Sequence, residues 1–371
     1  MAKLTSPDIM KQKNKKKVLK IIYTEKNIYR AKIAEMTHMS TQTVTNITKE
    51  LLSEELIYEV TLEKKALGRN PMALSINESG MFVIGVEISV RSIRTILTDF
   101  SGKVILSTKK DIEKDINVID ILKESIEHML NGFDYVDNIK GIGITVEGIV
   151  NADEGIVVKA VDLNLYNVNI KEELEYLGIP ILLENDVNGT AIVEKYRYNK
   201  TKNFMLVKLD SGIGASFVLN DELLSSTNNV SGEFGHTRIY RNTDIKKCKC
   251  GRLGCLTTEA SIGALKEKYQ LDYETIKKEV ENGNAEIRKH LIEIAKLTGQ
   301  LLSNVIVLLD LDEIILTGRL INDFNSILYD EIKTEIQDNI PGWVSFRRLS
   351  VLDINDIKNV STQLAIENYF R

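Results

Sequence analysis

The sequence predicts an α/β protein with a small basic head followed by a body made of two strand-rich halves. Three observations indicate this architecture. Residues 1–77 show three helical patterns and then a hairpin pattern. From residue 82 onward the chain becomes β-rich, and a second strand-rich block begins near residue 204. Two blocks of strands that each carry helices are typical of a duplicated, two-lobed fold rather than of one doubly wound sheet.

Length and composition are those of an ordinary globular chain. The 371 residues suffice for two or three domains with real cores, and 43% of them are hydrophobic and 27% charged. No apolar run approaches the roughly 20 residues that a membrane span needs. The start of the chain has no apolar signal-peptide core. Together with an unpaired number of cysteines, these features predict a reducing, cytoplasmic location.

The head is predicted to contain three helices. Val18 and Ile22 give an apolar face behind the Lys11–Lys17 cluster, and a short second helix stops near His38. Histidine stands here where glycine is usual in the tight turn, but it tolerates positive φ better than most residues. Ser40 can cap the third helix by accepting a hydrogen bond from a free backbone amide.

The third helix has a core face and a polar face. Val44, Ile47 and Leu51 repeat at helical spacing and are expected to face the core. The opposite face carries short polar side chains, which are suited to reading base edges in a major groove. The candidate DNA-binding residues are Thr41, Gln42, Thr45, Asn46 and Lys49 on this helix, together with Arg69 beyond it.

The hairpin completes the head. Alternating residues 58–62 lead into a basic segment, and residues 72–76 return as a second strand, which is the pattern of a β-wing with a basic tip. We therefore predict a winged helix-turn-helix DNA-binding domain at residues 1–77. This head has 14 Lys and Arg against 8 Asp and Glu, whereas the rest has 34 against 45. The bias favours contact with a polyanion; a solvated lysine-rich terminus or a protein-binding domain is the alternative.

The body, residues 78–371, is predicted to alternate strands and helices. Strands are expected at 82–88, 92–99, 103–106, 139–146, 179–183, 204–209, 216–219 and 313–316, and helices at about 118–130 and 285–309. The short strand 179–183 ends at Glu184-Asn185-Asp186, which places polar side chains at the mouth of a strand.

All three cysteines lie within eight positions, in Cys248-Lys-Cys250-Gly-Arg-Leu-Gly-Cys255, and His236 precedes them. Three thiolates and an imidazole are a common ligand set for a structural, four-coordinate zinc. The alternatives are one disulfide with a spare thiol, or three incidental thiols. An isolated cluster suits neither a disulfide framework nor an apolar core. We therefore predict a metal site whose ligands are His236, Cys248, Cys250 and Cys255.

The segment Gly232-Glu-Phe-Gly-His236, followed by Cys-x-Cys-Gly-x-x-Gly-Cys, strongly resembles the ROK family of repressors, open reading frames and sugar kinases. Residues 183–188, Leu-Glu-Asn-Asp-Val-Asn, match a second family motif. The resemblance covers essentially the whole chain and is to the family's xylose-repressor-like regulators. It implies an actin/hexokinase-like (ribonuclease H-like) body with a sugar in its cleft. The lobes would be about 78–185 plus the C-terminal helix, and 186–355.

The resemblance also implies a sugar-binding site formed by Asn185, Asp186, Glu233 and His236. Polar side chains matched to neighbouring hydroxyls, in a cleft that excludes water, are what sugar recognition requires. In the family's kinases the residue matching Asp186 is the general base on the attacking sugar hydroxyl. If one ring nitrogen of His236 binds zinc, the other can face the sugar.

Three nucleotide-binding elements depart from the family's kinases. The first phosphate loop, Asp-x-Gly-Gly-Thr in the enzymes, reads Glu87-Ile-Ser-Val-Arg91, and the second carries Asp210 where a triphosphate should sit. Thr317-Gly-Arg319 replaces a glycine-rich turn near the adenosine site. These changes predict that the chain does not transfer phosphate. The family's sugar-binding glutamate is Thr257 here, and Glu259, two positions on, is expected to face another direction.

Together these features predict a cytoplasmic, sugar-responsive transcriptional repressor that binds double-stranded operator DNA as a homodimer or tetramer. A structural Zn²⁺ is the expected cofactor, and no membrane partner is expected. One alternative is a ROK sugar kinase that phosphorylates hexoses with ATP and has kept a DNA-binding head. Another is a zinc-stabilised DNA-binding protein without a small-molecule effector. The sequence leaves open which sugar is bound and whether it releases or promotes DNA binding.

Overall fold

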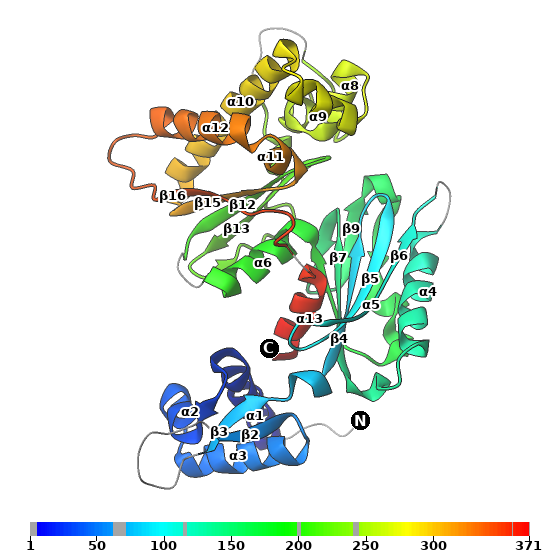
Figure 1. Ribbon diagram of the computed structural model, residues 1–371, viewed down its shortest axis with the longest axis vertical. Coiled ribbons are helices and arrows are strands. Elements are labelled where there is room, and N and C mark those ends of the chain that lie inside the picture. Colours follow the sequence, from blue (N-terminus) through cyan, green and yellow to red (C-terminus); the bar gives the residue numbers. More distant parts are fainter. Residues whose placement is uncertain are drawn as a thin grey trace. The chain divides into compact units, whose positions relative to one another are not determined.

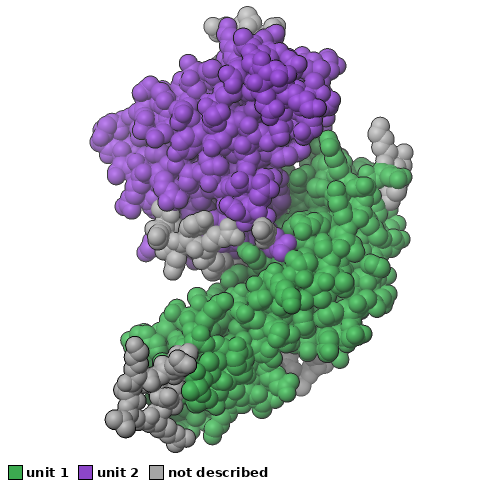
Figure 2. All heavy atoms as spheres, viewed as in Figure 1, with its two compact units in different colours: residues 1–184, 361–371 green, residues 185–360 purple. Residues whose placement is uncertain are grey.

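The computed structural model describes residues 6–61, 72–113, 117–198, 202–239, 245–357 and 359–370, and Figure 1 labels its elements. The chain divides into two compact units, coloured separately in Figure 2. Unit 1 contains residues 1–184 and 361–371, and unit 2 contains residues 185–360. Each unit holds its own five-stranded sheet. The predicted α/β body with two strand-rich halves is therefore confirmed.

The head, within unit 1, forms three helices and a small sheet. Its elements are α1 (Ser6–Glu25), β1 (Ile28–Tyr29), α2 (Arg30–Thr37), α3 (Thr41–Ser53), β2 (Ile57–Thr61) and β3 (Met72–Ile76). β3 lies between β1 and β2 and is antiparallel to both. The sequence did not predict β1, because two residues are too few to form an alternating pattern. The predicted winged helix-turn-helix is confirmed, although the wing tip with Arg69 lies outside the described residues.

Local backbone chemistry orients the third helix. His38 adopts the left-handed conformation at the end of α2, with φ of 57°. Ser40 Oγ accepts a hydrogen bond from the Thr43 amide at 3.1 Å and so caps α3, as predicted. Val44 and Leu51 are fully buried. Because this apolar face is fixed in the core of the head, the polar face of α3 points to solvent.

The main sheet of unit 1 has the order β11-β7-β4-β5-β6. Its strands are β4 (Phe82–Ile88), β5 (Ser92–Asp99), β6 (Val104–Asp111), β7 (Ile139–Val146) and β11 (Ile181–Asn185), and its helices are α4 (Val118–Asn131), α5 (Ile170–Glu173) and α13 (Val360–Phe370). A second sheet contains β8 (Ile149–Asn151), β9 (Ile156–Ala160) and β10 (Leu165–Asn169). The sequence did not predict these three strands, because they are short and separated by tight turns.

Unit 2 repeats the topology of the first main sheet. Its strands are β12 (Phe204–Leu209), β13 (Ile213–Leu219), β14 (Glu222–Leu223), β15 (Glu313–Thr317) and β16 (Arg348–Val351), in the order β14-β13-β12-β15-β16. Its helices are α6 (Asp186–Tyr198), α7 (Thr257–Ala260), α8 (Ile262–Tyr269), α9 (Tyr273–Glu281), α10 (Ala285–Leu309), α11 (Arg319–Asp323) and α12 (Asn325–Asn339). β12 is antiparallel to β13 and parallel to β15, as β4 is to β5 and β7. This repetition is the predicted duplication.

Helix α10 is apolar for most of its length. Among the described residues it is the one helix that is long and apolar enough to cross a membrane, judged by length and composition alone. Its fully buried side chains, such as Leu291 and Leu302, belong to the main apolar core of unit 2. Packing in this core accounts for the apolar residues on the buried face of α10, whereas Val307, Leu308 and Leu309 at its end are exposed.

Helix α13 joins the head to the main sheet of unit 1. Gly143 on β7 permits close approach, because a Cβ there would lie 2.0 Å from the carbonyl oxygen of Ser361. Farther along α13, the Phe370 ring lies 5.0 Å from the Tyr23 ring and 6.0 Å from the Phe100 ring, measured between centroids. One apolar cluster thus contains side chains of the head, of β4 and of α13. The head shares its core with the body of unit 1.

Replacing Phe370 with alanine is expected to lower the free energy of unfolding of unit 1 by about 3–5 kcal/mol. The side chain is 5% exposed and completes the core that the head shares with the sheet. Chemical denaturation followed by circular dichroism measures the change. Tyr166→Ala, at a side chain that is 51% exposed, is the control and should shift stability by less than about 0.5 kcal/mol. Wild-type stability of Phe370→Ala would contradict the shared core.

Candidate functional site

The predicted histidine–cysteine cluster is brought together in unit 2. The ligand atoms of His236, Cys248, Cys250 and Cys255 all lie within 4.8 Å of one another. Cys248 Sγ is 3.5 Å from His236 Nδ1, and Cys250 Sγ is 3.6 Å from Cys255 Sγ. A disulfide bond would need about 2.05 Å, so the thiols are free. Ligand atoms about 3.5–3.8 Å apart suit a tetrahedral ion with bonds of about 2.1–2.3 Å, and the cluster is therefore compatible with a metal ion.

Two glycines place the His236 segment against strand β13. A Cβ at Gly232 would lie 2.0 Å from a backbone oxygen of β13, and a Cβ at Gly235 would lie 2.4 Å from another. Gly232 also has φ of +95°, a conformation that other residues rarely adopt. The 3₁₀ turn η5 (Phe234–His236) follows directly. Both glycines of the motif are therefore required by packing and backbone geometry.

The two ring nitrogens of His236 face different partners. Nδ1 faces Cys248, whereas Nε2 lies 3.5 Å from Glu233 Oε2. Burial raises the pKa of the Glu233 carboxyl, and His236 opposes that shift. A metal-bound histidine usually directs its second ring nitrogen to a carboxylate or another acceptor. The geometry thus fits a ring that binds a metal through Nδ1 and is oriented through Nε2.

Asn185 and Asp186 lie where β11 meets α6. Asn185 Oδ1 accepts hydrogen bonds from the amides of Val187 and Asn188 at 2.9 and 3.1 Å, and so caps α6. Asp186 Oδ2 accepts a hydrogen bond from Lys208 Nζ at 2.7 Å. α6 and η5 both pack against β13. Asp186 on α6 and His236 on η5 are thus carried by elements that pack against the same strand, β13. Asn185 directly precedes α6, and Glu233 directly precedes η5.

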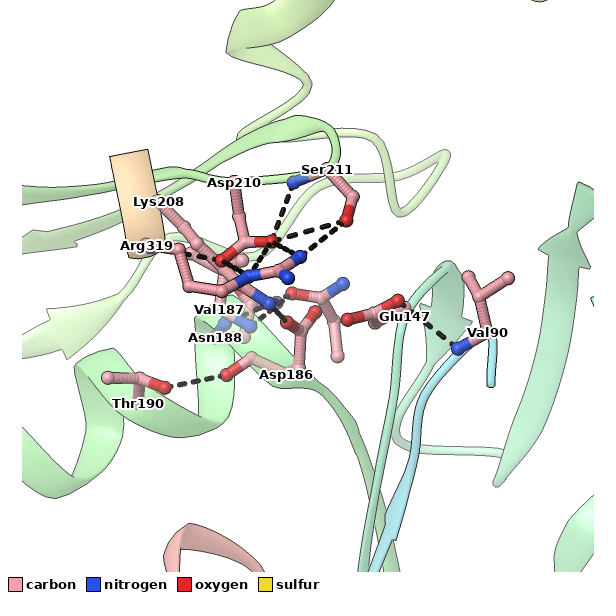
Figure 3. A network of polar contacts seen from close by, with 11 residues as sticks. Val90, Glu147, Asp186, Val187, Asn188, Thr190, Lys208, Asp210, Ser211 and Arg319 are labelled. Carbon is pink, nitrogen blue, oxygen red and sulfur yellow. Dashed lines mark hydrogen bonds and ion pairs between the residues drawn. The ribbon is translucent and has the colours of Figure 1, made fainter. Parts of the chain in front are cut away.

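Asp210 and Arg319, two positions at which the sequence is expected to depart from the kinase pattern, form a single ion pair (Figure 3). Arg319 Nη2 lies 2.5 Å from Asp210 Oδ1, and the Arg319 amide donates to Oδ2 at 3.0 Å. Arg319 Nη2 also donates to Ser211 Oγ at 2.8 Å. Burial pushes the pKa of Asp210 upward, but the hydrogen bonds from Arg319 outweigh it and bring the pKa to about 2. The sequence drew attention to Asp210 and to Arg319 separately, but it did not predict that the two side chains form an ion pair.

The segment expected to correspond to the first phosphate loop lies in unit 1, and its Val90 also meets a carboxylate of that unit. The Val90 amide donates to Glu147 Oε2 at 3.4 Å, as Figure 3 shows. Glu87 lies 3.4 Å from Arg94 Nη1, and burial raises the pKa of its carboxyl against the effect of Arg94. The backbone amide of Val90 is therefore directed at a carboxylate of the same unit.

The structure also places Thr257, which is expected to replace a family glutamate, and the nearby Glu259. Thr257 begins α7, and Glu259 in the same helix is 6% exposed. Glu259 Oε1 lies 3.7 Å from Lys246 Nζ. The carboxylate of Glu259 is thus buried beside a lysine of unit 2.

The candidate DNA-contacting residues other than Arg69 all lie on α3. Gln42, Asn46 and Lys49 are exposed, and Gln42 Nε2 donates to Asn46 Oδ1 at 3.1 Å. Thr45 is half-buried, and its hydroxyl donates to the Thr41 carbonyl at 2.8 Å. The two exposed amides thus form a polar pair on the surface of α3, whereas the Thr45 hydroxyl donates to the backbone of the helix.

Acid is expected to weaken unit 2 through Asp210. Its folded-state pKa of about 2 lies below the ordinary 3.8, so the pair with Arg319 stabilises the fold above about pH 4 and loses this effect as the pH falls toward 2. The full contribution is about 2 kcal/mol. Asp210→Asn should therefore be less stable than wild type near neutral pH, with the gap closing in acid.

Unfolding curves measured between about pH 6 and pH 2 test this linkage. The control is Asp330→Asn, at an exposed position of α12, which should follow the wild type throughout. A stability gap for Asp210→Asn that stays constant across the range would contradict the assigned ion pair.

Comparison with known proteins extends these observations. Residues 83–347 match the ROK family and residues 14–62 match the MarR family. The xylose repressor of Bacillus subtilis is 31% identical over 268 residues, which are 70% of this chain and 69% of that protein. The xylose repressor of Caldicellulosiruptor bescii is 32% identical over 267 residues, or 69% of this chain, and the match spans 66% of that protein.

The likeness extends to a solved structure. A ROK family transcriptional regulator, a homolog of the E. coli MLC protein, aligns with a TM-score of 0.85 at 25% identity. The alignment covers 98% of this chain and 97% of the other. It therefore includes the head as well as the body. This chain belongs to the ROK family, with a MarR-like winged-helix head on an actin/hexokinase-like body.

Proposed function

We propose that this chain is a sugar-responsive transcriptional repressor that works in the cytoplasm. Residues 1–77 would bind double-stranded operator DNA, and residues 78–371 would bind the effector and form the dimer. The observation that carries this proposal is the presence, in one chain, of a winged helix with an exposed polar recognition face and a ROK body. Two relatives that match about 70% of this chain are named as xylose repressors.

The DNA contacts would come from the recognition helix and the wing. Gln42, Asn46 and Thr41 would read base edges, because amide and hydroxyl groups match their donors and acceptors. Thr45, whose hydroxyl donates to the helix backbone, would contribute its methyl group or its hydroxyl oxygen as an acceptor. Lys49 and Arg69 would contact phosphates. Two copies of the head are needed to occupy a palindromic operator, so a homodimer or a tetramer is the proposed assembly.

The ligand would be a sugar bound by Asn185, Asp186, Glu233 and His236. Asp186 and Glu233 supply carboxylate acceptors, and Asn185 supplies an amide whose direction is fixed by its capping bonds. Such converging polar groups are what sugar hydroxyls require. The names of the relatives make D-xylose the first sugar to test. We expect the sugar to release the operator; co-repression is the opposite outcome of the same titration.

Phosphate transfer is not part of this proposal. Asp210 carries a negative charge at the second phosphate loop, and Arg319 already occupies its carboxylate. In the first loop, Glu147 takes the Val90 amide. The kinase alternative is supported by the fold and by Asp186, and a coupled phosphorylation assay with ATP–Mg²⁺ and hexoses tests it. Phosphorylation of a hexose by the wild-type chain would favour the kinase over the repressor.

A structural Zn²⁺ is proposed for the histidine–cysteine cluster. His236, Cys248, Cys250 and Cys255 would hold it, since their ligand atoms are spaced for a tetrahedral ion. When bound, the ion would supply cross-linking rather than reaction chemistry. It would fix the cysteine loop to the turn that carries Glu233, and thereby orient a ligand-binding group.

Operator binding that responds to sugar is the decisive prediction. A duplex selected from a random library by the wild-type chain serves as the operator in gel-shift titrations. We expect a saturating effective sugar to weaken binding at least about tenfold. Lys49→Ala should lower affinity by about tenfold and flatten its salt dependence, whereas Lys296→Ala, at an exposed position of α10, should not. Failure of every sugar to change operator affinity would reject the effector model.

Metal content is predicted to depend on each cysteine of the cluster. Elemental analysis of the purified chain should find about one zinc per chain. Cys250→Ser should lose most of the metal and lower the unfolding temperature of unit 2, because a ligand bond is removed. Lys249→Ser, in the same loop, should keep it. A wild-type chain free of metal, with stability unaffected by a chelator, would contradict the zinc proposal.

A further inference from the structure

We propose that Lys208 is a specificity-determining residue of the ligand site. Its ammonium would hold the Asp186 carboxylate in place and supply a hydrogen-bond donor beside it. This inference rests on the proposed function, because it concerns the same sugar site. It adds a cationic side chain to the four residues that the family motifs supply.

Lys208 interrupts an otherwise apolar strand. Its neighbours Val207 and Leu209 are fully buried, and β12 is the central strand of the sheet of unit 2. The Lys208 side chain nevertheless remains 25% exposed. A lysine in a central strand is costly unless its ammonium meets a partner or water. The position therefore calls for a specific polar partner.

The sheet brings that partner to Lys208. Lys208 pairs with Gly214 on the neighbouring strand β13. A Cβ at Gly214 would lie only 3.0 Å from Val187 Cγ2, so the absence of a side chain lets the first turn of α6 rest on the hairpin. This contact places Asp186 Oδ2 2.7 Å from Lys208 Nζ. The Asn185 cap fixes the same turn through backbone amides.

The pair offers a sugar both an acceptor and a donor. The Asp186 side chain is 22% exposed, and one of its oxygens already accepts from Lys208. A ligand hydroxyl can donate to the carboxylate while the oxygen of the adjacent hydroxyl accepts from the ammonium, which has three N–H groups. Hydrogen bonds to charged groups are the stronger ones. Lys208 and Asp186 would therefore select a sugar by the relative orientation of two neighbouring hydroxyls.

A purely structural ion pair would also join β12 to α6, and the variants must separate the two roles. The chain offers a matched control in the same unit: Lys277 Nζ lies 2.9 Å from Asp323 Oδ1, with side chains 28% and 24% exposed. Lys277→Met thus removes an ion pair of similar length and exposure that includes none of the proposed ligand residues. Lys208→Arg keeps the charge, Lys208→Met removes it, and Asp186→Asn removes the opposite charge.

Isothermal titration with D-xylose, D-glucose and N-acetyl-D-glucosamine, alongside thermal unfolding, tests the proposal on the full chain. For the sugar that the wild type binds best, Lys208→Met should lose at least about tenfold in affinity. Lys208→Met should also lose the wild type's preference for that sugar over its epimer. Lys208→Arg should restore part of the affinity and part of the preference. The double variant with Asp186→Asn should lose less than the two single losses combined. Lys277→Met should bind as wild type does.

Each contrary result has a defined meaning. If Lys208→Met keeps wild-type affinity and preference while only its unfolding temperature falls, the pair is a structural staple and this inference is overturned. If Lys208→Met loses affinity no more than Lys277→Met does, the inference is overturned as well. If the wild type binds none of the sugars, the proposed function fails, and the assignment of Lys208 fails with it.

Discussion

Close backbone approach to strand β13 is the constraint on which the site in unit 2 depends. Gly214 within the strand allows the first turn of α6 to approach, and Gly232 and Gly235 allow η5 to approach from the neighbouring segment. Side chains at these positions would collide with backbone or with packed methyl groups. The three glycines therefore let α6 and η5 lie close to β13, and this packing positions the Asp186 carboxylate and the His236 ring.

Electrostatic pairing follows from this packing. In unit 2, Lys208 faces Asp186, and Arg319 faces Asp210. Buried or half-buried charges are tolerated when each has a partner, because the attraction and hydrogen bonds offset lost hydration. The pair of Asp210 with Arg319 joins the end of β12 to the start of α11 and so braces the fold of unit 2.

In unit 1, helix α13 imposes a second constraint. It rests on the sheet where Gly143 gives it room, and its Phe370 ring enters the core of the head. The head and the sheet consequently share apolar surface that neither could bury alone. A change in the packing of α13 on the sheet would be felt directly at α1 and its aromatic partner Tyr23.

The sequence by itself determined the periodic elements and the motif chemistry. The apolar spacing of α3, the Ser40 cap and the strands at 82–88, 92–99 and 204–209 follow from local rules, because each depends on neighbours a few residues away. The cysteine cluster was equally visible in the sequence, because all three cysteines of the chain lie between residues 248 and 255. Short strands such as β1, β8 and β16 were not, since they acquire their partners only in the folded chain.

Only the tertiary structure decided which distant side chains meet. Nothing local in the sequence pairs Asp210 with Arg319 or Asp186 with Lys208, and nothing places Phe370 in the core of the head. The only sequence signal for Lys208 was a single lysine within an apolar strand, which local rules treat as an exposed residue. Such contacts depend on strand order and on the approach of helices to glycines. These are properties of the whole fold, because each requires segments far apart in the chain to be packed at once.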